Sequence, residues 1–245
     1  MKQDRPLSYS ALKQFDISPN HLIAYWNRDL TQSAAQIKGT LIHTLTLEPE
    51  TFEEKYAIFD GKVKRGKAYD AFVEENEGKL IISQKDYDDA STVKSAIFSN
   101  EAVHELFLET HTTEKLVEWE SMDMKFKGFV DGIGDGFIFD LKTTASADPN
   151  KFTSDAFKYG YAMQAAMYCM ACRVENYYII AAESTSPNNV TLFKMSDELL
   201  QYGVSEFQRI VEKYKAWDGN PVGYSDVVEV LGLPNWFKRQ QEETF

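Results

Sequence analysis

Three side chains suited to metal binding and proton transfer, Asp131, Asp140 and Lys142, lie close together in the middle of the chain. Side chains alternate between the two faces of a β-strand, so Asp140 and Lys142 are expected on one face, about 6.6 Å apart. A glycine-rich turn over 132–136 would fold two strands antiparallel and bring both carboxylates to one end of a sheet. Carboxylate oxygens bind Mg²⁺ or Mn²⁺, and a nearby lysine can orient or deprotonate a water. The pattern favours metal-assisted hydrolysis of a phosphodiester, although an Asp-x-Lys tripeptide alone is more often a solvated strand face.

The elements that would position these groups follow from the periodicity of the apolar residues. Strands are predicted over 114–119, 124–131, 136–142, 177–182 and 190–194, the first three as an antiparallel meander. Helices are predicted over 34–47, 68–76, 84–107, 156–172 and 197–217, and another begins near residue 8. We therefore expect an α+β fold with a central mixed, antiparallel-containing sheet flanked by helices.

The organisation predicted from this pattern is one domain over residues 1–245. Its helical N-terminal part covers about 1–110, the catalytic sheet and helix cover about 112–195, and a C-terminal helix and tail cover about 196–245. No internal repeat or low-complexity linker interrupts it.

Composition excludes several classes of protein. The chain has 245 residues, of which 43% are hydrophobic, so it can bury a sizeable core and is neither disordered nor collagen-like. The net charge of −12 argues against a protein that coats nucleic acid but not against an enzyme that acts on it. No apolar stretch is long enough for a membrane span or a signal peptide, so we expect no membrane association and a cytoplasmic location. Cys169 and Cys172 are too few for a disulfide framework or a structural zinc site.

Seven short segments share their residue types and their order with one known superfamily. They are 39–43 (GTLIH), 47–49 (LEP), 64–67 (KRGK), Glu114, 129–131 (FVD), 140–144 (DLKTT) and 161–168 (YAMQAAMY). On these segments the chain resembles the PD-(D/E)xK nuclease superfamily, and within it the phage and prophage recombination exonucleases of the exonuclease VIII (RecE) and lambda exonuclease type. The resemblance covers most of the chain, but Phe129 and Val130 stand where many relatives carry a proline before the first aspartate.

The resemblance implies a role for each matching residue of the site. Asp131 and Asp140 would be the metal-binding carboxylates, and Lys142 would activate the water. The main-chain carbonyl of Leu141 would be a further metal ligand, and His43 would help to hold a second metal as a neutral imidazole. Taken alone, His43 would be a packed or capping histidine. Glu114 matches a family glutamate, but a strand-end surface carboxylate is the simpler explanation of it.

The predicted helix 156–172 supplies the next group. Phe157, Tyr161, Gln164 and Tyr168 are spaced by four, three and four residues, which places them on one helix face. Gln164 resembles the glutamine that braces the catalytic lysine and the substrate phosphate, and its alternative role is a core-edge amide.

Residues expected to contact DNA lie in three places. Tyr161 and Tyr168 belong to the helix just described, Ser8 and Ser10 stand at a helix start where they would grip a terminal phosphate or simply cap the helix, and Lys64, Arg65 and Lys67 form a basic loop that is either solvated or bound to phosphates.

The activity implied by the resemblance is that of a Mg²⁺-dependent exonuclease, for which Mn²⁺ would substitute. It would resect linear double-stranded DNA from 5′ ends to leave 3′ single-stranded tails for phage-type homologous recombination. The resemblance also implies a homo-oligomeric ring, a trimer or tetramer, and a single-strand annealing protein as partner. With two cysteines we expect neither an iron–sulfur cluster nor zinc. The alternatives are a structure-specific or restriction-like endonuclease with the same site, and a catalytically silent DNA-binding scaffold.

Overall fold

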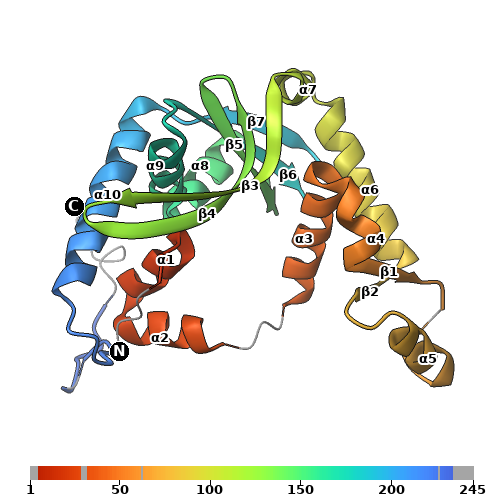
Figure 1. Cartoon of the computed structure of the whole chain (residues 1–245), viewed down its shortest axis with the longest axis horizontal. Coiled ribbons are helices and arrows are strands. Elements are labelled where there is room, and N and C mark those ends of the chain that lie inside the picture. The colour runs from red at the N-terminus through yellow and green to blue at the C-terminus, as the bar shows by residue number, and fades with distance from the viewer. Residues whose placement is uncertain (1–4, 29–31, 62, 226, 234–245) are drawn as a thin grey trace.

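A five-stranded mixed sheet forms the centre of the computed structural model, which describes residues 5–28, 32–61, 63–225 and 227–233 (Figure 1). Its strands, in spatial order, are β3 (Thr110–Ser121), β4 (Met124–Gly134), β5 (Phe137–Thr144), β6 (Asn176–Glu183) and β7 (Val190–Lys194). β3, β4 and β5 form the predicted antiparallel meander, β5 and β6 are parallel, and β6 and β7 are antiparallel. The predicted α+β fold with a mixed central sheet is confirmed.

Helices cover both faces of this sheet and bury two apolar cores. The helices are α1 (Tyr9–Ile17), α2 (Pro19–Asn27), α3 (Ala34–Leu47), α4 (Phe52–Lys55), α5 (Lys67–Glu75), α6 (Gln84–Ser99), α7 (Glu101–Leu108), α8 (Pro149–Lys158), α9 (Tyr161–Cys172) and α10 (Asp197–Ala216), with a short 3₁₀ turn at Pro49–Thr51. α1, α9 and α10 pack on one face with Phe126, Ile138 and Ile179, and α3 and α6 pack on the other with Phe139, Leu141 and Ile180. Among the described residues, no helix combines the length and apolar character that crossing a membrane requires.

Two helices that the sequence predicted as continuous are each split in the structure. Helix 84–107 is interrupted at Asn100, whose side-chain oxygen accepts a hydrogen bond from the Val103 N–H and so begins α7. Helix 156–172 is interrupted at Gly160, whose φ of +74° is left-handed and ends α8 before α9 begins. Phe157 therefore belongs to α8, where its side chain is 60% exposed, and the prediction that it shares a face with Gln164 is wrong.

A small projecting arm contains the helix predicted over 68–76 and two strands that were not predicted from the sequence. β1 (Tyr56–Phe59) and β2 (Leu80–Ser83) form a two-stranded parallel sheet, and α5 lies between them in the chain. Figure 1 shows the arm at the lower right, away from the central sheet. Four-residue strands contain too little alternation to be recognised, and α5 is joined to them by Phe59, whose ring meets Tyr69 at 5.1 Å.

Candidate active site and metal centre

The predicted catalytic residues line one cavity of about 400 Å³ between α3, the central sheet and α9. Its lining consists mainly of polar side chains: Gly39, Thr40, His43, Thr44, Glu48, Glu114, Asp131, Asp140, Leu141, Lys142, Thr143 and Gln164. The start of α3 is fixed by a capping box in which Ser33 and Gln36 bond to each other's main chain. Gly39 then allows α3 to approach β5 closely, because a Cβ there would lie 3.0 Å from the Thr143 hydroxyl oxygen. This approach brings His43, one turn later, over the sheet.

On the α9 side of the cavity, Asp140, Lys142 and Gln164 form a closed set of polar contacts. The Lys142 ammonium lies 2.8 Å and 2.7 Å from the two Asp140 oxygens and donates to Gln164 Oε1 at 3.1 Å. The Gln164 amide in turn donates to Asp140 Oδ1 at 2.8 Å. Asp140 is 3% exposed and Gln164 is 7% exposed, so both are fixed by packing as well as by these bonds. The predicted sharing of one strand face by Asp140 and Lys142 is what the structure contains.

On the α3 side, His43, Glu114 and Asp131 form a group whose ligand atoms all lie within 4.8 Å of one another. His43 Nδ1 is 3.8 Å from Glu114 Oε1 and 3.8 Å from Asp131 Oδ2. His43 Nε2 faces the Leu141 carbonyl oxygen at 2.6 Å, and the Leu141 N–H donates to Asp131 Oδ2 at 2.6 Å. An imidazole whose one nitrogen bonds to a main-chain carbonyl presents the other to a metal in a fixed orientation. The Leu141 carbonyl thus orients His43 in this structure, and its predicted role as a metal ligand stays a prediction.

Glu114 is the residue of this group whose role the sequence left open. It lies within β3 but adopts a left-handed φ of +49°, which breaks the two-residue alternation of the strand. Its neighbours Thr113 and Lys115 remain paired with Gly132 and Val130 of β4. The register leaves Glu114 opposite Asp131, and its Oε1 lies 3.8 Å from His43 Nδ1.

The electrostatics of the cavity are those of a cation site. Burial and the neighbouring Asp140 carboxylate raise the pKa of Asp131 from 3.8 to about 7. Burial disfavours charge on His43, but Asp131 and Glu114 outweigh it and raise its pKa to about 9. Burial likewise opposes charge on Lys142, yet Asp140 and Asp131 hold its pKa above the ordinary value. A divalent cation would relieve this crowding of carboxylates, and two carboxylates with one imidazole form a donor set that fits Mn²⁺ or Mg²⁺.

The residues predicted to contact DNA do not form one surface. Ser8 caps α1, because its hydroxyl oxygen accepts from the Ala11 N–H at 3.2 Å, and Ser10 is exposed in the first turn. In the arm, Lys64 bonds to the Ile81 carbonyl and to Asp86, while Arg65 and Lys67 are exposed. None of these five lines the cavity.

The two predicted DNA-contacting tyrosines of α9 differ in position. Tyr161 is half-buried, and its ring centroid lies 4.9 Å from Lys142 Nζ. Tyr168 is 7% exposed and packs so tightly on Gly128 that a Cβ there would meet its ring at 2.5 Å. This position does not support a contact between Tyr168 and DNA, because its ring fills the space between α9 and β4.

Two residues near the cavity escaped the sequence reasoning. Tyr159 precedes the Gly160 break and is 43% exposed. Lys13 lies on α1 with its amino group 5.5 Å from the Tyr159 ring, and burial together with the nearby charge of Lys142 lowers its pKa. The signal that could have found Tyr159 is the sequence Tyr-Gly-Tyr itself, because an isolated glycine in a helical pattern can end the helix.

A mixed sheet with helices on both faces and an Asp-x-Lys strand beside a second aspartate defines a domain of the PD-(D/E)xK class. The chain belongs to the family described as "PDDEXK-like domain of unknown function (DUF3799)", whose model matches residues 8–221. The resemblance found in the sequence is thereby confirmed. No curated protein matches the chain's sequence.

Solved structures share this fold. A protein from Eubacterium rectale, named as an exonuclease by inference, is 17% identical, with coverage of 97% of this chain and 93% of its own and a TM-score of 0.62. A phage-related exonuclease from Haemophilus somnus 129PT is 13% identical over 87% of this chain and 96% of its own, with a TM-score of 0.39. An alkaline exonuclease from Laribacter hongkongensis is 12% identical over 98% of this chain and 95% of its own, with a TM-score of 0.35. At 17% identity and a TM-score of 0.62, the likeness to the Eubacterium rectale protein shows a common fold.

Proposed function

We propose that this protein is a divalent-metal-dependent deoxyribonuclease that hydrolyses phosphodiester bonds at DNA ends. The observation that carries the proposal is the cavity in which two groups meet: the cluster His43, Glu114 and Asp131, and the pair Asp140 and Lys142. The first supplies a donor set for a hard cation, and the second supplies a positioned ammonium beside a carboxylate. A protein that only bound DNA would gain nothing from burying these charges together.

Each side chain has a separate task in this proposal. A divalent cation held by His43, Glu114 and Asp131 would stabilise negative charge on the scissile phosphate and acidify the attacking water. Lys142, charged and held by Asp140, would orient that water or donate a hydrogen bond to the oxygen that gains charge. Gln164 fixes the Lys142 ammonium through its carbonyl and Asp140 through its amide, so neither group is free to turn away.

The finer features of the proposal rest on the resemblance to recombination exonucleases. They are Mg²⁺ as metal with Mn²⁺ as substitute, 5′-to-3′ resection of linear double-stranded DNA, a role in phage-type homologous recombination, a homo-oligomeric ring, and a single-strand annealing partner. The neighbour from Eubacterium rectale, named as an exonuclease, supports an end-dependent activity over an internal one.

The experiment that tests the proposal is digestion of linear, nicked and covalently closed circular duplexes, labelled separately at the 5′ and 3′ ends, with Mg²⁺, Mn²⁺ or EDTA. We expect metal-dependent loss of the linear duplex from its 5′ ends, with the closed circle intact. Asp140→Asn should abolish the activity. The matched control is Asp123→Asn, because Asp123 is a fully exposed aspartate in a turn with a φ of +58°, which asparagine tolerates.

Other outcomes would replace the proposal. Cutting of the closed circle would make the protein an endonuclease with the same site. Inertness of the folded protein with every divalent metal would favour a silent DNA-binding scaffold. Equal activity of Asp140→Asn and Asp123→Asn would show that the cavity is not the active site.

A further inference from the structure

A strip of aromatic rings and amino groups borders the active-site cavity where α8 gives way to α9. We define this tyrosine strip as Tyr159, Tyr161, Lys13 and Lys158. The two rings lie 6.0 Å apart, tilted by 35°, and the Tyr161 ring centroid is 4.9 Å from Lys142 Nζ. The Lys13 and Lys158 amino groups lie 5.5 Å and 5.7 Å from the Tyr159 ring. The strip therefore runs outward from the catalytic lysine.

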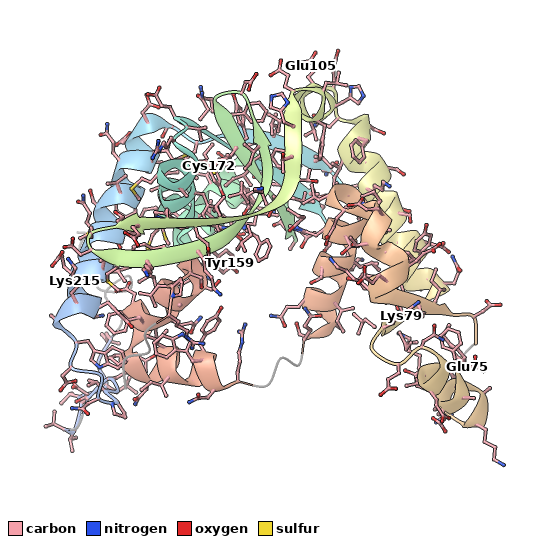
Figure 2. The ribbon with its side chains drawn as sticks, viewed as in Figure 1. Glu75, Lys79, Glu105, Tyr159, Cys172 and Lys215 are labelled. Atoms are coloured by element: carbon pink, nitrogen blue, oxygen red, sulfur yellow. The ribbon has the colours of Figure 1, made fainter. Side chains whose placement is uncertain are left out.

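The fold holds this strip in place. Gly160 has a left-handed φ of +74° between the end of α8 and the start of α9, and the Tyr159 and Tyr161 rings on either side of it lie 6.0 Å apart. The Tyr9 hydroxyl donates to the Tyr159 carbonyl at 2.7 Å and ties the junction to α1. Figure 2 shows Tyr159 near α1 and below the β3–β4 hairpin in this view. The strip is a built feature rather than a loose loop.

The chemistry of the strip matches an unpaired nucleotide. Tyr159 is 43% exposed, so a base can reach its side chain. Bases inside a duplex are already stacked on both faces, so such a ring is suited to a base that has left the duplex. The amino groups of Lys13 and Lys158 lie 5.5 Å and 5.7 Å from the ring, so they are near the phosphates of a nucleotide stacked there. The chain has a net charge of −12, so two amines beside one exposed ring contrast locally with its overall negative charge.

We propose that the tyrosine strip binds unpaired nucleotides of the DNA strand that enters the cavity, by stacking bases on Tyr159 and Tyr161 and pairing phosphates with Lys13 and Lys158. This inference rests on the proposed nuclease function and adds the substrate's state: the strand is single-stranded where it meets the strip. It also gives the acidic protein a means of attracting a polyanion close to its carboxylate cluster.

The test measures binding rather than cleavage. A single-stranded oligonucleotide with 2-aminopurine near its 5′ end is titrated with the full-length protein in EDTA, and a blunt duplex serves as comparison. We expect tighter binding of the single strand and quenching of the 2-aminopurine fluorescence by stacking. Tyr159→Ala should weaken single-strand binding about five- to 100-fold and remove the quenching, and Tyr159→Trp should restore both. Lys13→Met should lower the slope of log affinity against log salt by about one.

The matched control is Tyr202→Ala on α10, because Tyr202 is also 43% exposed and also pairs with an aromatic ring, that of Phe157. Single-strand binding by Tyr159→Ala at the wild-type level, an equal loss in Tyr202→Ala, or absence of single-strand binding in the wild type would each overturn the inference. If digestion requires Asp140 but single-strand binding does not depend on Tyr159, the nuclease function is supported and the role of the tyrosine strip is refuted. If single-strand binding depends on Tyr159 but no metal supports digestion, the role of the tyrosine strip is supported and the nuclease function is refuted.

Discussion

Asp131→Asn should make the metal-free protein more stable while removing its response to metal. The substitution keeps the side-chain shape and an oxygen that can still accept the Leu141 N–H, a bond of 2.6 Å in the wild type. It removes a negative charge that is disfavoured here, since burial and Asp140 raise the pKa of Asp131 from 3.8 to about 7. Each pKa unit corresponds to about 1.4 kcal/mol, so the charged form costs about 4 kcal/mol at most.

The expected gain is smaller than this limit because the site relaxes. A gain of about 2 kcal/mol in the free energy of unfolding is realistic, which for a chain of this size raises the melting temperature by about 4–8 °C.

The pH dependence of this gain has a defined direction. Well below pH 3.8 Asp131 is protonated in both the folded and unfolded states, so its charge costs nothing. As the pH rises from there to about 7, the unfolded state loses its proton first and the folded state loses stability. The advantage of the variant should therefore grow between pH 4 and 7 and then stay constant.

The assay is thermal or urea unfolding in EDTA and in Mn²⁺, at several pH values. Metal should raise the stability of the wild type and leave that of Asp131→Asn unchanged. The stability advantage of the variant should therefore shrink or reverse in Mn²⁺. Asp123→Asn, at an exposed site, should follow the wild type in every condition. A variant less stable than the wild type in EDTA at pH 8, or one with the wild-type response to Mn²⁺, would refute the reasoning.

Three further predictions concern other parts of the molecule. Lys142→Ala should lower DNA hydrolysis by about 100- to 10,000-fold in a labelled-end assay, because it removes the group that orients the water, and a loss below tenfold would contradict that role. The affinity for Mn²⁺, measured by calorimetry in the absence of DNA, should rise from pH 6 to pH 9, because the pKa of Asp131 is about 7 and that of His43 about 9 and the metal must displace their protons; a flat profile would contradict the proposed ligands. Gly203→Ala should lower the free energy of unfolding in urea by about 1–3 kcal/mol despite better helix propensity, because its Cβ would lie 2.0 Å from the Ala162 carbonyl oxygen; an increase would show that α9 and α10 separate easily.

The parts of the fold that were predictable are those in which local periodicity and tertiary packing agree. The alternation of β4 and the glycine-rich turn that follows it predicted two strands and their antiparallel pairing, although β4 extends to Gly134 and β5 to Thr144. α3 was predictable over its full length because its apolar residues recur at helical spacing and Glu48 precedes a proline. The positions of Asp140 and Lys142 on one face followed from their place in β5.

The parts that were not predictable depend on single backbone conformations. Glu114 of the metal cluster has a φ of +49°, and nothing in its neighbours' types requires that value. Gly160 breaks the α8–α9 region, although glycine is tolerated inside many helices, and Tyr159 acquires its position only from that break. Tertiary bonds decide such points, here the hydrogen bond from the Tyr9 hydroxyl to the Tyr159 carbonyl.

The Asp-x-Lys spacing was informative because the main chain of the residue between the two charges, Leu141, also contacts residues of the site. Pairing of β4 with β5 ends at Gly132 and Phe139, so the next groups of β5 have no partner strand on that side. The Leu141 N–H is taken by Asp131 and its carbonyl faces His43, while its side chain is buried in the core under α3. One residue thus links β4 and α3, and the residues on either side of it turn to α9. Inserting a residue would send Lys142 to the opposite face and separate all three contacts, which is why spacing rather than residue type carried the prediction.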